Sequence, residues 1–212
     1  MAQATAIILA GGKSTRMGTD KALIRVKDDS MLEGAVRALA GGFSEIIVSA
    51  NNRTCASAKV KVVADVIPGR GPMSGIHAAL LASANDINFV VPCDMPFINV
   101  RLALYMVELA SGFDVVVPRI GDYYEALFAV YMKNCLPLIE EYLISGRNKV
   151  STLYANSALR IRYVEESEIG KFGNAESLFF NVNTPVDLQR AKKMAGRKDN
   201  GSEASDCTNI ED

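Results

Sequence analysis

Residues 9–21 read Leu9-Ala-Gly-Gly-Lys-Ser-Thr-Arg-Met-Gly-Thr-Asp-Lys21, and the rest of the chain is organised around them. This stretch overlaps a short apolar run, Ala6-Ile-Ile-Leu-Ala10, which predicts a buried strand. Two glycines come next and begin a polar loop rather than a helix. Gly11 and Gly12 let a ligand approach the backbone closely, so that backbone N–H groups at the strand end can contact it.

The charges of this loop indicate a polyanionic ligand. Lys13, Arg16 and Lys21 lie close to the glycines, and such cations suit a nucleoside triphosphate. The pattern G-x-x-x-x-G-K-[ST] would need a glycine where the chain has Met17, and G-x-G-x-x-G is also absent. The loop therefore predicts neither a P-loop kinase nor a dehydrogenase.

Length and charge limit the class of protein. A chain of 212 residues suffices for one α/β domain, since a protein of this size buries ~70% of its unfolded surface. The formal net charge of -1 argues against general nucleic-acid binding, which shows a basic excess. We expect no membrane span and no signal peptide. The four scattered cysteines predict reduced thiols in a cytoplasmic protein: Cys55, Cys93, Cys135 and Cys207.

Strand-like and helix-like segments alternate through the first half. Ser30 is expected to cap one helix, with Glu33 at the capping-box spacing, whereas Ser74 and Asn99 are expected to cap two others. This rhythm predicts an α/β fold of three layers, a mostly parallel, Rossmann-like sheet with helices on both faces. The expected strands are 5–10, 45–50, 61–64, 87–91 and 114–117, and the expected helices are 30–39, 74–84 and 100–110.

The second half is less regular but shows no linker. We expect a single domain over residues 1–195 and a disordered polar tail over residues 196–212. Thr184 and Pro185 predict a helix start. The other expected strands are 125–132, 159–164 and 179–183, and the other expected helices are 134–143 and 149–154.

Polar residues that follow the strands are the candidates for a site, because ligands bind at the carboxyl ends of strands in open α/β sheets. Asp94 can hold one Mg²⁺ together with phosphate oxygens and water, and capping of the next turn is the alternative. Asp65 can accept both N1–H and N2–H₂ of guanine, and an Asx turn before Pro68 is the alternative. Asn51 follows the expected strand 45–50.

Several motifs together resemble one family. The motif L-A-G-G-x-S-x-R-M-G-x-D-K at residues 9–21 resembles the signature of nucleotidyltransferases related to molybdenum cofactor guanylyltransferase. Asp94 lies in a similar C-D-x-P context, and Asp65 in a similar V-x-x-D context before a G-P-x-x-G loop. The stretch 179–188 resembles the family ending F-x-N-x-N-T-P-x-D-L.

The resemblance implies transfer of GMP from GTP to the phosphate of molybdopterin, with release of pyrophosphate and with Mg²⁺ as cofactor. It also implies transient contact with other cofactor-biosynthesis proteins or molybdoenzymes. From the charge balance and the lack of a spanning apolar run, we expect no nucleic-acid partner and no membrane partner. Asp94 would hold the metal. The implied catalytic residues are Arg16, Lys21 and Asp94. The implied GTP-binding residues are Leu9, Ala10, Gly11, Gly12, Lys21, Asn51, Asp65 and Asp94. The implied acceptor-binding residues are Asn181 and Asn183.

Two positions depart from the family pattern, and two other functions remain open. Ser49 stands where the family often has asparagine, and Glu125-Ala126 stands where proline is usual in P-L-x-A-V-Y. A related transferase could use CTP or another phosphorylated acceptor, although Asp65 suits guanine. A nucleotide-binding module without turnover would release no pyrophosphate.

Overall fold

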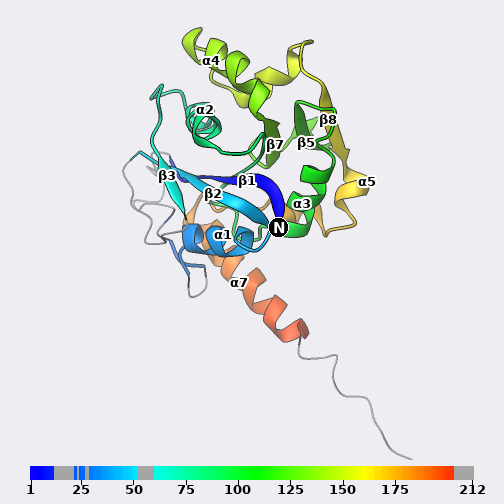
Figure 1. Cartoon of the computed structure of the whole chain (residues 1–212). Coiled ribbons are helices and arrows are strands. Elements are labelled where there is room, and N and C mark those ends of the chain that lie inside the picture. The colour runs from blue at the N-terminus through cyan, green and yellow to red at the C-terminus, as the bar shows by residue number, and fades with distance from the viewer. Residues whose placement is uncertain (12–21, 23, 27–28, 52–59, 203–212) are drawn as a thin grey trace, which may run out of the picture.

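Eight strands form one sheet within the described part of the chain, and helices cover both of its faces (Figure 1). Figure 1 draws the computed structural model, which describes residues 1–11, 22, 24–26, 29–51 and 60–202, with side chains up to residue 196. The strands are β1 (Ala2–Leu9), β2 (Phe43–Ser49), β3 (Lys61–Val63), β4 (Ile87–Pro92), β5 (Val115–Ile120), β6 (Tyr123–Tyr124), β7 (Ala129–Met132) and β8 (Ile161–Glu165). Their order is β3-β2-β1-β4-β7-β5-β6, and β8 pairs with β5.

The helices complete three layers. They are α1 (Met31–Leu39), α2 (Pro72–Ala82), α3 (Val100–Glu108), α4 (Leu136–Ile144), α5 (Glu166–Ile169), α6 (Ala175–Leu178) and α7 (Pro185–Ser202). Short 3₁₀ helices span Lys133–Cys135 and Val150–Ala155. Figure 1 shows α2 and α4 over one face of the sheet, and α1, α3 and α7 over the other. The predicted three-layer α/β architecture is confirmed.

Most strand pairs are parallel, as predicted. β1 pairs in parallel with β2 and β4, β2 with β3, and β5 with β8. β7 is antiparallel to both β4 and β5, and β6 is antiparallel to β5. The side chains of β1 alternate between two core clusters, with Ala6 and Ile8 in one and Ile7 and Leu9 in the other. Burial on both faces explains why this strand is a continuous apolar run rather than an alternating one.

Local capping signals are confirmed at α1 and α3 but not at α2. Ser30 and Glu33 form the predicted capping box, and the Asn99 side chain accepts from two backbone N–H groups at the start of α3. The predicted cap at Ser74 is wrong, because α2 begins at Pro72 after Gly71, whose φ is 68°. The fixed φ of proline suits the first helical turn, which moves Ser74 into the buried interior.

The segment before α7 differs from the prediction. Residues 179–183 form no strand, since the N–H of Val182 donates to the Asp94 carbonyl at 2.9 Å instead of to a neighbouring strand. The short helices α5 and α6 were not predicted. Glu168 of α5 accepts from the Tyr105 hydroxyl of α3 and from Arg162 of β8, each at 2.7 Å. These contacts between distant residues hold α5 against the sheet.

Asp114 joins three segments at the amino end of β5. Its buried carboxylate accepts from the Arg160 backbone N–H at 2.8 Å, from the Arg160 guanidinium at 3.0 Å and from the Asn134 amide at 2.7 Å. The hydrogen bonds from Arg160 hold the pKa of Asp114 well below its usual range. Because that pKa is lowered, the network adds stability above the ordinary carboxyl pKa and loses it as the pH falls through the folded value.

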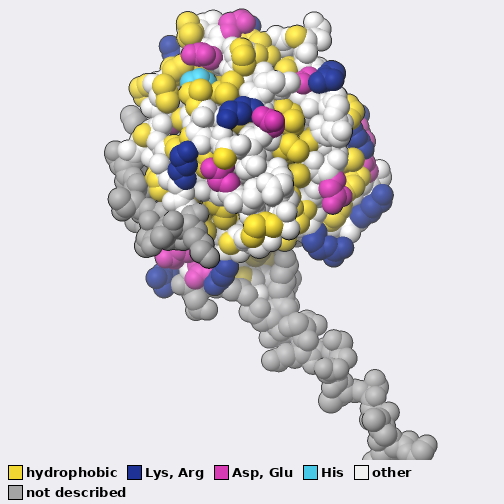
Figure 2. Space-filling view, viewed as in Figure 1, with side chains coloured by type: hydrophobic (Ala, Val, Ile, Leu, Met, Phe, Trp, Pro, Cys, Tyr) yellow, Lys and Arg dark blue, Asp and Glu magenta, His cyan; other side chains and the backbone are white. Residues whose placement is uncertain are grey.

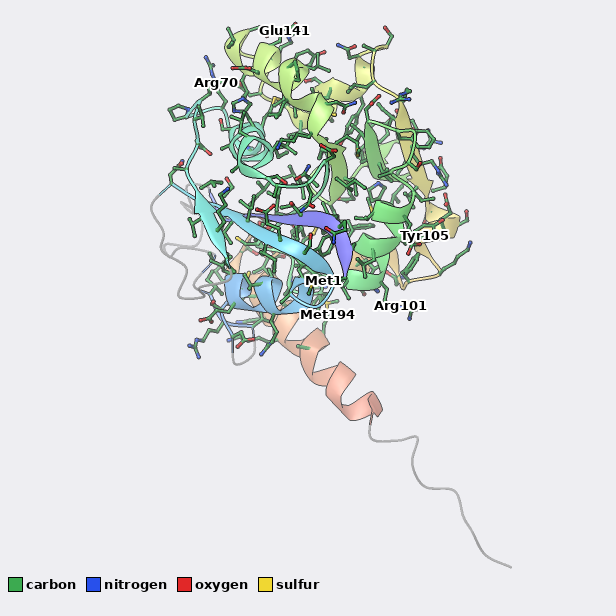
Figure 3. All side chains as sticks on the ribbon, in the orientation of Figure 1. Met1, Arg70, Arg101, Tyr105, Glu141 and Met194 are labelled. Carbon is green, nitrogen blue, oxygen red and sulfur yellow. The ribbon has the colours of Figure 1, made fainter. Side chains whose placement is uncertain are left out.

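Helix α7 continues to Ser202, beyond the predicted start of the tail at Gly196, and residues 203–212 lie outside the described part. Ala191 and Ala195 are buried, and Met194 packs against the cluster that contains Met31 of α1 (Figure 3). Among the described residues, no helix is both long and apolar enough to cross a membrane.

Truncation of α7 tests where the folded domain ends. A chain ending at Gly196 should keep the melting temperature of the full chain, because the residues beyond it lack apolar anchors. A chain ending at Arg190 should melt roughly 5 °C lower or more, because it loses Ala191, Met194 and Ala195 from the core. Thermal unfolding of the three chains measures both effects. Equal melting temperatures for the two truncated chains would contradict this boundary.

Candidate functional site

The carboxyl ends of four parallel strands lie at one edge of the sheet. Leu9, the last residue of β1, pairs with Ser49 of β2 and with Pro92 of β4. Ser49 in turn pairs with Val63, the last residue of β3. The four strands therefore end at the same level, which the sequence could suggest but not establish.

Backbone hydrogen bonds carry this register past the strand ends. The Ala10 N–H donates to the Ser49 carbonyl at 2.9 Å, and the Cys93 N–H donates to the Leu9 carbonyl at 3.0 Å. Residues two positions beyond each strand end thus share one level along the edge. In strand order from β3 to β4 these residues are Asp65, Asn51, Gly11 and Asp94.

Asp65 and Asn51 hold each other in place. The Asn51 Nδ2 donates to Asp65 Oδ2 at 2.9 Å, and the Asp65 backbone N–H donates to Asn51 Oδ1 at 2.8 Å. The Asp65 carboxylate thus accepts from the side chain of Asn51, two residues beyond β2. An Asx turn would instead require a hydrogen bond to the backbone of its own turn. An oriented and half-buried carboxylate at a strand end can accept two neighbouring N–H groups of a flat base.

Ser49 serves packing beneath this edge. Its side chain is buried, and a Cβ atom placed on Gly75 of α2 would lie 2.6 Å from Ser49 Oγ and 3.2 Å from Leu9 Cδ2. The absence of a side chain at Gly75 therefore allows α2 to approach the sheet. The side-chain amide at this edge is therefore that of Asn51, although the family often has its asparagine at the position of Ser49.

Asp94 links the first four strands to the C-terminal segment. Its carboxyl group is half-buried, and its backbone carbonyl accepts the N–H of Val182. Asn181 and Asn183 flank Val182, which is fully buried, whereas Asn181 is half-buried and Asn183 is exposed. Although the predicted strand is absent, the structure brings both asparagines next to Asp94.

The loop that suggested the function lies outside the described residues. This applies to Gly12, Arg16 and Lys21 among the predicted site residues. At the described end of the loop, a Cβ on Gly11 would meet only the Ser49 carbonyl, at 4.0 Å. Packing against the described residues thus does not demand a glycine at that position.

Glu125 is a residue of this edge that the sequence prediction placed inside a strand. β7 begins only at Ala129, and the Glu125 N–H donates to the carbonyl of Pro118 near the end of β5. Its half-buried side chain lines a cavity of about 560 Å³ together with Asn181. Burial raises the pKa of Glu125. The signal available in the sequence was a lone carboxylate opening the apolar run E-A-L-F-A-V-Y.

The histidine and the two described cysteines are buried, and none of them is part of the row of residues beyond the strand ends. His77, the single histidine of the sequence, is buried within α2 and 1% exposed. Burial lowers the pKa of its imidazole. Cys93 and Cys135 are buried and form no disulfide within the described part of the chain, and burial raises the pKa of Cys135 to about 12. Figure 2 shows acidic and basic side chains interspersed on the viewed face, as expected for a net charge near zero.

Comparison with known proteins identifies the family. The profile of the MobA-like NTP transferase domain matches residues 6–161. The chain belongs to the MobA-like NTP transferase family. It is 45% identical to the probable molybdenum cofactor guanylyltransferase of Pelotomaculum thermopropionicum, over 92% of this chain and 95% of that protein. It is 33% identical to the molybdenum cofactor guanylyltransferase of Syntrophotalea carbinolica, over 90% and 91% of the two chains.

Solved structures share the fold of this MobA-like protein. The molybdopterin-guanine dinucleotide biosynthesis protein A of Archaeoglobus fulgidus is 24% identical, with a TM-score of 0.79 over 91% of this chain and 99% of its own. The 2-C-methyl-D-erythritol 4-phosphate cytidylyltransferase of Thermus thermophilus is 16% identical, with a TM-score of 0.70 over 92% and 100%. The described sheet thus has the fold of these solved structures. The family model and the relatives make this MobA-like chain a nucleotidyltransferase.

Two matched substitutions test the packing beneath the edge. Gly75→Ala should destabilise the protein by about 1–3 kcal/mol, since its methyl group would overlap Ser49 and Leu9. Gly34→Ala is the control, because it lies inside α1 with no atom of the described residues within 4 Å of the new Cβ, and it should be neutral or stabilising. Adding Ser49→Ala to Gly75→Ala should restore part of the loss. Equal melting temperatures for the two glycine variants would refute this role of Gly75.

Proposed function

We propose that this chain transfers GMP from GTP to the phosphate of molybdopterin, forming the guanine dinucleotide form of the cofactor and releasing pyrophosphate. The observation that supports it most strongly is the level row of Asp65, Asn51, Gly11 and Asp94 in a chain of the MobA-like family. The acceptor follows from its relatives, which are named as molybdenum cofactor guanylyltransferases. A cytoplasmic location is part of the proposal, since both substrates are phosphorylated.

The residues that follow β3 and β2 bind one part of GTP, and the loop that follows β1 binds another. Asp65 accepts N1–H and N2–H₂ of guanine while Asn51 keeps the carboxylate oriented. The backbone from Leu9 to Gly12 cradles the triphosphate, and Arg16 and Lys21 neutralise it. Guanine selection thus depends on β2 and β3, and phosphate binding depends on the loop after β1.

Transfer proceeds by direct displacement at the α-phosphorus. An oxygen of the acceptor phosphate forms a bond to that phosphorus, while the bond to the bridging oxygen breaks and pyrophosphate leaves with the electron pair. The acceptor phosphate is already anionic near neutral pH, so no histidine base is needed. Arg16 and Lys21 stabilise the charge that develops on the leaving group, and the rest of the catalysis is positioning.

Asp94 fits a Mg²⁺ site that the substrate completes. In the described ranges, no three His, Cys, Asp or Glu side chains are grouped closely enough to hold a metal. A half-buried carboxylate at the row of strand ends matches the preference of Mg²⁺ for one or two protein carboxylates plus substrate phosphates. When bound, the ion would neutralise charge on the phosphates. Asn181 and Asn183 lie beside Asp94 and contact the acceptor.

Asp65→Asn tests base recognition. It keeps the size of the side chain but replaces one acceptor oxygen by a donor, so GTP binding should weaken by about 1–3 kcal/mol, or roughly 10–100-fold in Kd. Preference for GTP over CTP and ATP should shrink together with the affinity. Titration with all three nucleotides measures both quantities. The matched control is Asp86→Asn, an exposed aspartate at the opposite edge of the sheet, and it should bind GTP normally.

Two outcomes of the titration would contradict the proposed base contact. If Asp65→Asn keeps wild-type affinity and selectivity, Asp65 does not contact the base. If the wild type prefers CTP, the chain is a cytidylyltransferase that resembles its guanylyl relatives.

Asp94→Asn separates metal-dependent turnover from nucleotide binding. Removing the charge should lower Mg²⁺-dependent pyrophosphate release by roughly 100-fold or more. GTP binding without metal should persist, because the loop cations and Asp65 are unchanged. Pyrophosphate release with molybdopterin, beside GTP titration with and without Mg²⁺, measures the two effects. Near-normal Mg²⁺-dependent turnover in Asp94→Asn would place the metal elsewhere, and no release by the wild type would exclude the proposed activity.

A further inference from the structure

The cavity beside Glu125 opens at the same edge of the sheet as Asp94. β5 ends there at Ile120, which lines the cavity, and Glu125 lies in the segment that leads into β7. Asn181 is shared, because it lines the cavity and adjoins Val182, whose N–H bonds to the Asp94 carbonyl. β4, β7 and β5 are successive neighbours, so the cavity lies two strand spacings, ~10 Å, from the end of β4.

The charges of the described lining favour a ligand other than a phosphate. The lining has three carboxylates, from Glu125, Glu166 and Glu176, and its described residues include no lysine or arginine. Glu176 forms an ion pair with Arg190, and Glu166 is exposed. Glu125 is half-buried, and its carboxylate has no hydrogen bond or ion pair with any of the described residues. The cavity therefore suits a neutral group rich in N–H donors.

The walls of the cavity suit a flat heterocycle. Phe179 and Phe180 are buried apolar lining residues, and Phe179 packs edge-on against Phe128 with ring centroids 5.3 Å apart. Asn181 Nδ2 donates to the Phe179 carbonyl at 3.0 Å, which fixes the amide and leaves its oxygen as an acceptor. The volume of about 560 Å³ is within the usual range for small-molecule sites. Donors from a ligand would replace the water that burial has removed from Glu125.

We infer that Glu125 recognises the pterin ring of the acceptor, by accepting hydrogen bonds from its 2-amino group and the adjacent ring N–H. This inference rests on the proposed function for the identity of the acceptor. Guanine presents the same pair of donors, but Asp65 lies at the other end of the row of strand ends. The anionic cavity next to Asn181 is thus assigned to the heterocycle of the acceptor, whose phosphate reaches back toward Asp94.

Binding of free heterocycles to the full chain tests this assignment without turnover. The probes are 6-hydroxymethylpterin and 6-hydroxymethyllumazine, which differ at C2, where an amino group is replaced by an oxo group. The wild type should bind the pterin roughly 10–100-fold more tightly than the lumazine. Glu125→Gln should lose that preference, and Glu125→Asp should retain part of it. Glu108→Gln, at the exposed end of α3, is the matched control and should behave like the wild type.

Kinetics then assign the residue to one substrate. Glu125→Gln should raise the KM for molybdopterin by roughly 10–100-fold and leave kcat and the Kd for GTP unchanged. Equal binding of both probes by the wild type, no binding of either, or an unchanged KM in Glu125→Gln would overturn the inference. A matching rise in the Kd for GTP would assign the cavity to guanine instead. Selective pterin binding without guanylyl transfer would refute the proposed function and leave the inference standing.

Discussion

The parallel register of β3, β2, β1 and β4 is the constraint on which the rest of the structure depends. Each face of β1 is packed in a separate core cluster, with Ile7 on one side and Ile8 on the other. A slip of one residue would exchange these faces, so the register is fixed by burial on both sides. The level row of residues after the strands is a consequence of the core, because the same pairing that buries β1 aligns Gly11 with Asn51 and Asp94.

The direction of β7 extends this edge beyond the parallel strands. Because β7 runs antiparallel to β4, the segment entering it lies at the carboxyl end of β4 and brings Glu125 to the same edge as Asp94. Asp65 lies toward the other side of the row, two residues beyond the end of β3. Two carboxylates that can each accept paired N–H donors thus flank the position where we propose that phosphates meet. This arrangement suits the joining of two molecules that each consist of a heterocycle and a phosphate.

Stability and chemistry are separated along the strands. The buried carboxylate of Asp114, with its exposed partners Asn134 and Arg160, lies at the amino end of β5, opposite to the edge with the candidate site. Its charge is compensated by hydrogen bonds within the protein, which makes it a structural carboxylate. Asp94 and Glu125 are less buried and lie where ligands can reach them. Residues at this edge can therefore be substituted to suit a different substrate, while the residues at the opposite edge stabilise the fold.

Sequence by itself determined the layers of this protein and most of the candidate site. Apolar runs marked β1, β2 and β4, and the polar residues after them, Asn51 and Asp94, could be placed at strand ends because strands are local and parallel ends meet at one edge. The tertiary structure alone decided the hydrogen bond between Asn51 and Asp65, the packing role of Gly75, and the cavity beside Glu125. Each of these depends on contacts between residues far apart in the chain, which periodicity and capping signals do not encode.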